Sequence, residues 1–460
     1  MYRFFGREDE RTRIAAVLDG LGPGLVIVRG REGVGTTAFV ARALGDRPHL
    51  AYTAAPLTDA DHRALLGARL ELDGGADWPA LLDRFADRLE ERRDRTILVL
   101  DGAEHLLAAR SRLAGILAAF WSRIRARALP VHLVLVGSDP VALGALGAEG
   151  SPLADAITLD LELGPLPFRD VTGLLRGWSP RDRVTAWAVF GGMPTVVRRL
   201  DPAVGLAANL RRLALDPDAP LLLHGTDLLR RAVSAPARYA SVIRALADGR
   251  HEWGDIVAAV PDFTASGQLA PYLARLEGLR LVETRRSLDA RDHSRGRRYR
   301  LTDPFLSFWF RFVLPSLTEL EAGQAADVWA RRIRPFLDDH VRLHFPDLAR
   351  EYVARYAERL PAVAREAGGL WGPDWEVDVA ATLLGGAVCY GVCDWSDAPV
   401  GEESLGPIAH ALTRSRYGYG RQTRLEIVFH AGPVRDDLVR KAVREDQIRL
   451  VGLDDLLGAG

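Results

Sequence analysis

The stretch "VIVRGREGVGTTAFVARAL", residues 26–44, places an apolar strand, a glycine-rich turn and a helical pattern in that order. The turn follows the phosphate-binding template G-x-x-x-x-G-K-[ST] and keeps its glycines: Gly30, Gly33 and Gly35. Thr37 fills the hydroxyl position, but Thr36 stands where the template has lysine. The stretch therefore predicts a loop with the shape to wrap phosphate and without the cation that contacts it.

Apolar segments alternate with helical patterns through the first part of the chain. Strands are expected at residues 25–30, 49–55, 96–107, 131–139 and 156–167. Continuous apolar strands between helices are typical of a parallel sheet with helices on both faces. The sequence thus predicts an α/β nucleotide-binding core over residues 1–165, followed by a small helical lid over residues 166–230.

Polar residues close two of these expected strands. Asp101 follows the run "ILVL", and Ser138 follows "LVLVG". In nucleotide-binding loops of this kind, a Ser/Thr hydroxyl and an acid after a neighbouring strand organise Mg²⁺, so Thr37 and Asp101 are the expected metal ligands. Glu104 and Ser138 are the candidates for catalysis, as an activator of water and a contact to the terminal phosphate. The competing interpretation is that Asp101 is an ordinary turn residue.

Residues 235–302 show three helical patterns and then two short strands around a polar loop. This is the order of a winged helix-turn-helix, which we assign with its connecting helix to residues 231–324. The loop and its flanks, residues 285–300, carry seven arginines and only two acidic residues, Asp289 and Asp292. The arginines are Arg285, Arg286, Arg291, Arg295, Arg297, Arg298 and Arg300. With Arg275 of the third helix, they predict contacts to DNA phosphates. Alternatively, the loop is solvated and the domain binds protein.

Residues 325–460 form a second predicted α/β unit. Its Cys389 and Cys393 lie in an apolar run and are expected to be buried thiols of a strand, because two cysteines cannot build a disulfide framework or a four-ligand zinc site. No apolar run is long enough for a membrane span, and the N-terminus lacks the layout of a signal peptide, so we expect a cytoplasmic protein. The net charge of −1 restricts any nucleic-acid contact to local patches.

An ordered set of segments resembles one family across nearly the whole chain. The segments "FFGREDE", "LVLDGAEHL", "VLVGSD", "FGGMP" and "LTDPFLSFWFRFV" accompany the loop in order. They are similar to those of archaeal-type P-loop ATPases, related to the STAND and AAA groups, that carry a winged helix and a C-terminal PD-(D/E)XK endonuclease-like domain. The resemblance implies ATP or ADP with Mg²⁺ as ligands. It implies these contacts to the nucleotide: Gly30, Gly33, Val34, Gly35, Thr36, Thr37, with Arg7 beside the base and Pro194 against the adenine.

The chain also departs from this family, and each departure removes a charge. Gly102 stands where the family has a glutamate after Asp101, and no arginine follows "SPL". In the endonuclease-like part, Asp378 is kept, but "VCD", ending at Asp394, replaces Glu-x-Lys. The resemblance therefore implies a degenerate member, in which Asp378 and Asp394 mark a vestigial nuclease site.

Three hypotheses remain open at this point. The first is an ATP- or ADP-binding, DNA-associated regulator or scaffold with degenerate ATPase and nuclease sites. The second is a slow but genuine ATPase that uses Glu104 or a residue of a neighbouring subunit. The third is a purely structural interaction protein. Partners expected under these hypotheses are DNA, a second copy of the chain or another protein, and no membrane.

Overall fold

The computed structural model describes residues 4–72, 77–92, 94–263, 265–290, 296–421 and 423–458. The chain divides into two compact units. The first is Met1–Pro165 with Gly278–Arg280, and the second is Leu166–Glu277 with Leu281–Gly460. In the described part of the chain, no helix is both long and apolar enough to cross a membrane.

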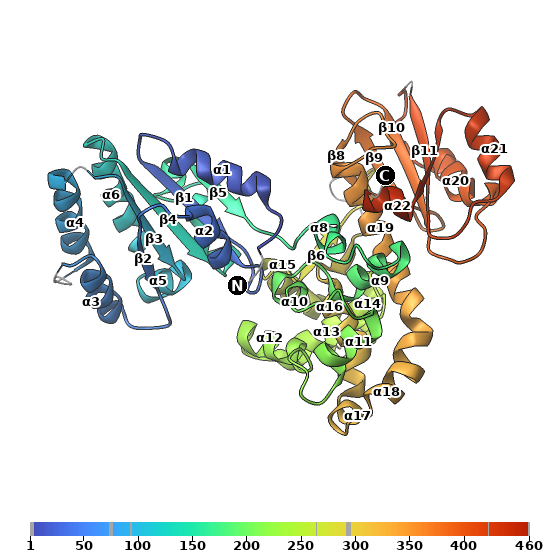
Figure 1. Ribbon diagram of the computed structural model, residues 1–460, viewed down its shortest axis with the longest axis horizontal. Coiled ribbons are helices and arrows are strands. Elements are labelled where there is room, and N and C mark those ends of the chain that lie inside the picture. Colours follow the sequence, from blue (N-terminus) through green and yellow to red (C-terminus); the bar gives the residue numbers. More distant parts are fainter. Residues whose placement is uncertain are drawn as a thin grey trace. The chain divides into compact units, whose positions relative to one another are not determined.

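The first unit is built on a sheet of five parallel strands in the order β2-β3-β4-β1-β5, which confirms the predicted parallel sheet (Figure 1). The strands are β1 (Gly24–Arg29), β2 (Leu50–Thr53), β3 (Thr96–Asp101), β4 (Val131–Gly137) and β5 (Leu159–Glu162). The helices are α1 (Glu8–Leu18), α2 (Thr36–Leu44), α3 (Asp59–Arg69), α4 (Trp78–Arg92), α5 (Ala103–Ala109), α6 (Leu113–Ala126) and α7 (Pro140–Gly144).

Both faces of this sheet are buried, which explains the uninterrupted apolar strands of the sequence. Leu25 and Ile27 of β1 point into a core shared with α3, α4 and α6. Val26 and Val28, which alternate with them, are also fully buried, and α1 and α2 contact β1. Because the strands are parallel, the carboxyl ends of β1, β4 and β3 meet at one edge of the sheet, and this is where the site residues of the unit lie.

The second unit begins with helices and continues with a three-helix segment and a hairpin. The first helices are α8 (Phe168–Gly173), α9 (Pro180–Phe190), α10 (Pro194–Val197), α11 (Leu206–Leu210) and α12 (His224–Ala232). The next elements are α13 (Pro236–Ala247), α14 (Trp253–Ala259), α15 (Ala270–Gly278), β6 (Val282–Arg285) and β7 (Arg298–Leu301). Strands β6 and β7 pair in antiparallel fashion.

The aromatic segment after β7 lies in the core of the second unit. It folds into α16 (Pro304–Phe308) and the π-helical turn η5 (Trp309–Val313), and α17 (Leu317–Glu321) and α18 (Ala325–Val328) lead to the long α19 (Leu337–Arg355). The ring of Trp309 is buried against Gly225, where an added Cβ would lie 2.3 Å from a ring carbon. The indole nitrogen donates to Leu222 O at 2.9 Å, so the buried polar atom is satisfied.

The last part of the second unit is a mixed sheet in the order β12-β11-β10-β9-β8. Strands β8, β9 and β10 are antiparallel, whereas β10, β11 and β12 are parallel. The elements are β8 (Ala364–Trp371), β9 (Glu376–Leu383), β10 (Val388–Asp394), α20 (Gly406–Arg414), β11 (Arg424–His430), α21 (Asp436–Arg444), β12 (Ile448–Gly452) and α22 (Leu453–Leu457). Cys389 and Cys393 are free thiols of β10, and burial raises the pKa of Cys389 to about 12.

Candidate nucleotide site and arginine cluster

The loop between β1 and α2 depends on its glycines for backbone reasons. Gly33 and Gly35 have φ of 90° and 85°, a left-handed backbone conformation that residues with a Cβ atom rarely adopt. At Gly30 a Cβ would lie 2.6 Å from the carbonyl oxygen of Leu163, so the loop passes directly against the chain after β5. The result is a strand, a left-handed loop and a nine-residue helix whose first N–H groups have no partner within the helix.

Arg7 holds this loop in place. Its Nη2 donates to Val34 O at 2.8 Å and to Gly164 O at 3.0 Å, and the residue is 7% exposed. The guanidinium therefore joins the middle of the loop to the chain that follows β5. The structure assigns Arg7 a contact to the loop itself, and its predicted place beside the base stays a prediction.

Thr36 and Thr37 differ sharply in exposure at the start of α2. Thr36, in the lysine position of the template, is buried at 7% exposure, whereas Thr37 is exposed. The only lysine of the chain is Lys441, which pairs with Glu402 at 3.3 Å in the second unit. No lysine of the first unit can therefore take the missing role.

The two predicted catalytic residues lie against each other. The Oε1 atom of Glu104 on α5 accepts from Ser138 N at 3.0 Å and from Ser138 Oγ at 2.6 Å, just after β4. The other carboxylate oxygen, Oε2, lies so close to the backbone of Gly137 that a Cβ there would be 2.2 Å away. Glu104 is thus packed over the end of β4, and Ser138 is its partner.

Asp101 ends β3 at the same edge of the sheet, and its Oδ1 accepts from Gly102 N at 2.9 Å. Gly102 itself has φ of 72° and precedes α5. A Cβ at Gly102 would lie 2.6 Å from Ala54 O, because Ala54 N bonds to Asp101 O at 2.7 Å and brings the two chains together. This backbone has no room for the glutamate that the resemblance places after Asp101.

Pro194 belongs to the second unit, where it begins α10. The neighbouring Gly192 approaches the backbone of Leu166, which donates to Gly192 O at 2.8 Å. An added Cβ at Gly192 would lie 2.3 Å from Leu166 O. The glycine is therefore required by the local packing, and the contact of Pro194 with an adenine stays a prediction.

An arginine cluster within the second unit uses several of the residues predicted to bind DNA. The carboxylate of Asp347 on α19 lies 2.6 Å from Arg285, 2.9 Å from Arg350 and 3.5 Å from Arg300. Burial alone would raise the pKa of Asp347, but the three guanidinium charges hold it well below its usual range. The sequence did not predict Asp347 or Arg350 as site residues, because no local signal pairs Asp347 with Arg285, which is 62 positions away.

The remaining arginines predicted to bind DNA fall into two groups. Arg298 pairs with Glu376 at 2.8 Å and lies 4.7 Å from the centre of the Trp371 ring, so it also faces the C-terminal sheet. The exposed ones are Arg275, Arg286 and Arg297, of which Arg275 donates to Ala232 O at 3.0 Å. Arg291 and Arg295 lie outside the described residues. The basic hairpin is therefore partly an internal ion-pair surface.

The vestigial nuclease residues lie on neighbouring strands. Asp378 of β9 accepts from Cys393 N of β10 at 2.8 Å, and burial raises the pKa of Asp378 to about 6. Asp394 ends β10, one residue after Cys393. Among the residues that the structure describes, no three His, Cys, Asp or Glu side chains come together in a way that could hold a metal ion.

Comparison with solved structures identifies the fold of the chain. The Walker-type ATPase of Pyrococcus abyssi aligns with 67% of this chain and 96% of its own length, at 18% identity and a TM-score of 0.51. About two thirds of the chain therefore share the P-loop fold of this Walker-type ATPase. The ORC2 protein of Aeropyrum pernix aligns with 70% of this chain and 96% of its own, at 17% identity and a TM-score of 0.45.

Sequence comparisons extend the likeness beyond the sheet of the first unit. Residues 309–404 match a family, DUF234, described as archaeal and bacterial proteins of unknown function. An uncharacterized protein of Methanocaldococcus jannaschii is 22% identical over 386 residues, which are 82% of this chain and 84% of that protein. The similarity therefore reaches from the P-loop ATPase fold into the C-terminal part.

Proposed function

We propose that the first unit binds ATP or ADP with Mg²⁺ and hydrolyses the nucleotide slowly or not at all. The observation that carries the proposal is the backbone of residues 30–37, left-handed at Gly33 and Gly35 and followed directly by α2. Free N–H groups of such a loop and helix start attract phosphate without any side chain. The P-loop ATPase fold supports the same proposal.

The loop has the backbone shape that suits ATP or ADP with Mg²⁺, but it lacks the positive side chain that usually contacts the phosphates. An added Cβ at Gly35 would meet nothing within 4 Å, so the loop is open on that side, and Thr37 is exposed beside it. Thr37 and Asp101 would hold Mg²⁺, which neutralises phosphate charge when bound. Thr36 supplies no charge, and Glu104 is already bonded to Ser138, which favours weak binding over the slow-ATPase alternative.

Titration of the full chain with ATP and ADP, with and without Mg²⁺, tests this proposal. We expect weak binding that tightens with Mg²⁺, and an Asp101→Ala variant that loses most of the Mg²⁺-dependent gain, because one metal contact is removed. Asp94→Ala, exposed just before the opposite end of β3, is the matched control and should bind like the wild type. If millimolar nucleotide neither binds nor shifts the melting temperature, the proposal is contradicted, and only the hypothesis of a structural interaction protein is left.

We further propose that α13–α15 and the β6–β7 hairpin form a winged helix that contacts DNA phosphates, and that the C-terminal sheet is an endonuclease-like fold without cleavage activity. The exposure of Arg275, Arg286 and Arg297 supports the first part. The pairing of Asp378 with a backbone N–H, and the absence of a neighbouring lysine, support the second. The protein would then act as a nucleotide-binding regulator or scaffold on DNA.

DNA binding measured against salt tests the winged-helix proposal. Replacing Arg286 and Arg297 together by glutamine should weaken binding and reduce the slope of log K against log salt by about two, since each phosphate contact contributes roughly 0.9. Arg244→Gln, an exposed change on α13, should leave the slope unchanged. Identical slopes for the double variant and the control would contradict the contact and favour a protein partner for this segment.

A further inference from the structure

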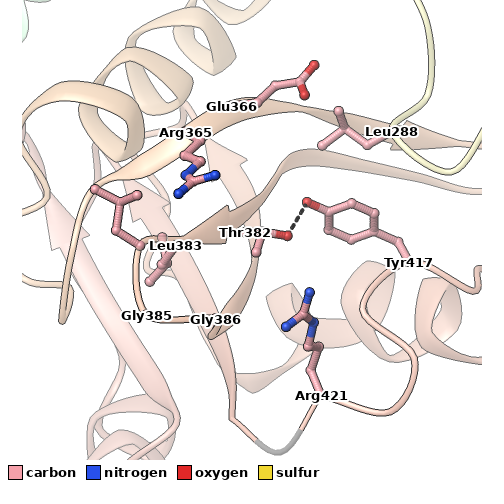
Figure 2. A pocket seen from close by; sticks show the side chains of 10 residues that line it. Leu288, Arg365, Glu366, Thr382, Leu383, Gly385, Gly386, Tyr417 and Arg421 are labelled. Carbon is pink, nitrogen blue, oxygen red and sulfur yellow. Dashed lines mark hydrogen bonds between the residues drawn. The ribbon is translucent and has the colours of Figure 1, made fainter.

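A cavity of about 410 Å³ opens beside the C-terminal sheet. Figure 2 shows its walls. They come from the start of β8, the end of β9 with the turn that follows, the segment between α20 and β11, and Leu288 after β6. The volume lies in the usual range of small-molecule sites. Segments that are far apart in sequence thus build a concave surface that the sequence did not predict.

Two arginines from opposite walls point into this cavity. Figure 2 shows the guanidinium groups of Arg365 on β8 and Arg421 before β11 directed toward its centre. In the part of the chain that the structure describes, neither group forms an ion pair or a side-chain hydrogen bond, whereas Arg285 and Arg298 are paired with carboxylates. Each unpaired guanidinium presents a planar fork of donors that suits phosphate or carboxylate oxygens.

Two hydroxyl groups add a neutral donor between the arginines. Thr382 Oγ1 and Tyr417 OH lie 3.1 Å apart, and either can donate to the other. Because this bond uses one of the two hydroxyl protons, the other proton is available to an acceptor in the cavity. The cavity therefore combines two positive charges with a short-range donor, which is the composition of an oxyanion site.

Apart from Glu366, the rest of the described wall is apolar or lacks side chains. Gly385 and Gly386 form the turn after β9 with φ of 106° and 93°, a conformation that keeps side chains out of the mouth of the cavity. Leu288 and Leu383 supply an apolar surface beside the donors. Among the described residues that line the cavity, Glu366 is the one carboxylate, and Figure 2 shows it pointing away from both guanidinium groups. An occupant thus needs a charged end and a small apolar or planar body.

We propose that this cavity binds a small phosphate monoester, with the phosphate between Arg365 and Arg421 and its organic part against the leucines. A dianionic phosphate matches the two arginine charges, and with Glu366 the described lining residues carry a net charge of about +1, which favours an anion over a neutral ligand. The site is independent of the P-loop: it belongs to the second unit and to different residues.

Calorimetric titration of the full-length protein with phenyl phosphate and with inorganic phosphate tests the site. We expect phenyl phosphate to bind more tightly than inorganic phosphate, because only the ester reaches the leucines. Arg365→Gln and Arg421→Gln should each weaken phenyl phosphate binding about tenfold or more, the size of a lost charge-assisted hydrogen bond. Glu366→Gln should strengthen it severalfold, because a repelling charge is removed.

Arg416→Gln is the matched control, since Arg416 is exposed one residue from Tyr417 and does not line the cavity. It should bind both probes like the wild type, and melting curves should show that all variants are folded. Equal losses in Arg416→Gln and Arg421→Gln would reduce the effect to diffuse surface charge and overturn the proposal. So would unchanged binding in the Arg365 and Arg421 variants, which would leave the P-loop as the phosphate site.

Discussion

Replacement of Asp347 by alanine is expected to destabilise the second unit by about 3 kcal/mol or more, the cost of leaving partly buried charges without their partner. Three guanidinium groups converge on this carboxylate, from Arg285, Arg300 and Arg350. The side chains of Asp347 and Arg300 are only 20% and 13% exposed, so water screens the three cations poorly once the carboxylate is gone.

Hydrogen exchange, followed peptide by peptide, measures this effect where it should appear. Protection should fall in α19 and in the β6–β7 hairpin, and it should be unchanged in the sheet of the first unit. Asp339→Ala is the matched control, because Asp339 lies on the same helix and pairs with Arg342, but its side chain is 51% exposed. Its cost should stay below about 1 kcal/mol. Similar effects of the two variants would show that the cluster adds nothing to an ordinary surface pair.

Replacement of Thr36 by lysine is expected to tighten binding of ATP with Mg²⁺ by about 10- to 100-fold and to add little hydrolysis. The gain follows from a charge-assisted contact to phosphate at the first residue of α2. Hydrolysis should stay low because position 102 carries no acid and Glu104 is bonded to Ser138. A missing stabiliser of the transition state alone costs on the order of 10²–10³ in rate.

Nucleotide titration and phosphate release, measured on the same samples, separate the two parts of this prediction. Ala38→Lys places the same charge on an exposed position of α2 and should leave the affinity nearly unchanged. Adding Gly102→Glu to Thr36→Lys should destabilise the first unit, by about 2 kcal/mol, because of the positive φ and the nearby Ala54 carbonyl. Strong ATPase activity from Thr36→Lys alone would contradict our account of Gly102 and Glu104.

The parallel sheet and its loop could be predicted from the sequence because their signals are local. Buried parallel strands are apolar over most of their length, as in residues 25–28 of β1 and 133–136 of β4, and a left-handed loop needs glycine at positions such as Gly33 and Gly35. The ordered family segments gave the same fold, and the P-loop ATPase fold is confirmed. The missing lysine at Thr36 is likewise a fact of the sequence alone.

The sequence could not predict where charges find partners, because this depends on packing between distant segments. From the sequence, the arginines of the β6–β7 hairpin were predicted to form a basic surface. In the structure, Asp347 and Glu376 form ion pairs with some of them. Gly102 looked like a lost glutamate, but the chain at Ala54 excludes any side chain there. The cavity between Arg365 and Arg421 could not be predicted from the sequence either, because segments far apart in the chain build it. Residue types determined the fold and the missing charges, whereas long-range packing decided which remaining charges are free to bind.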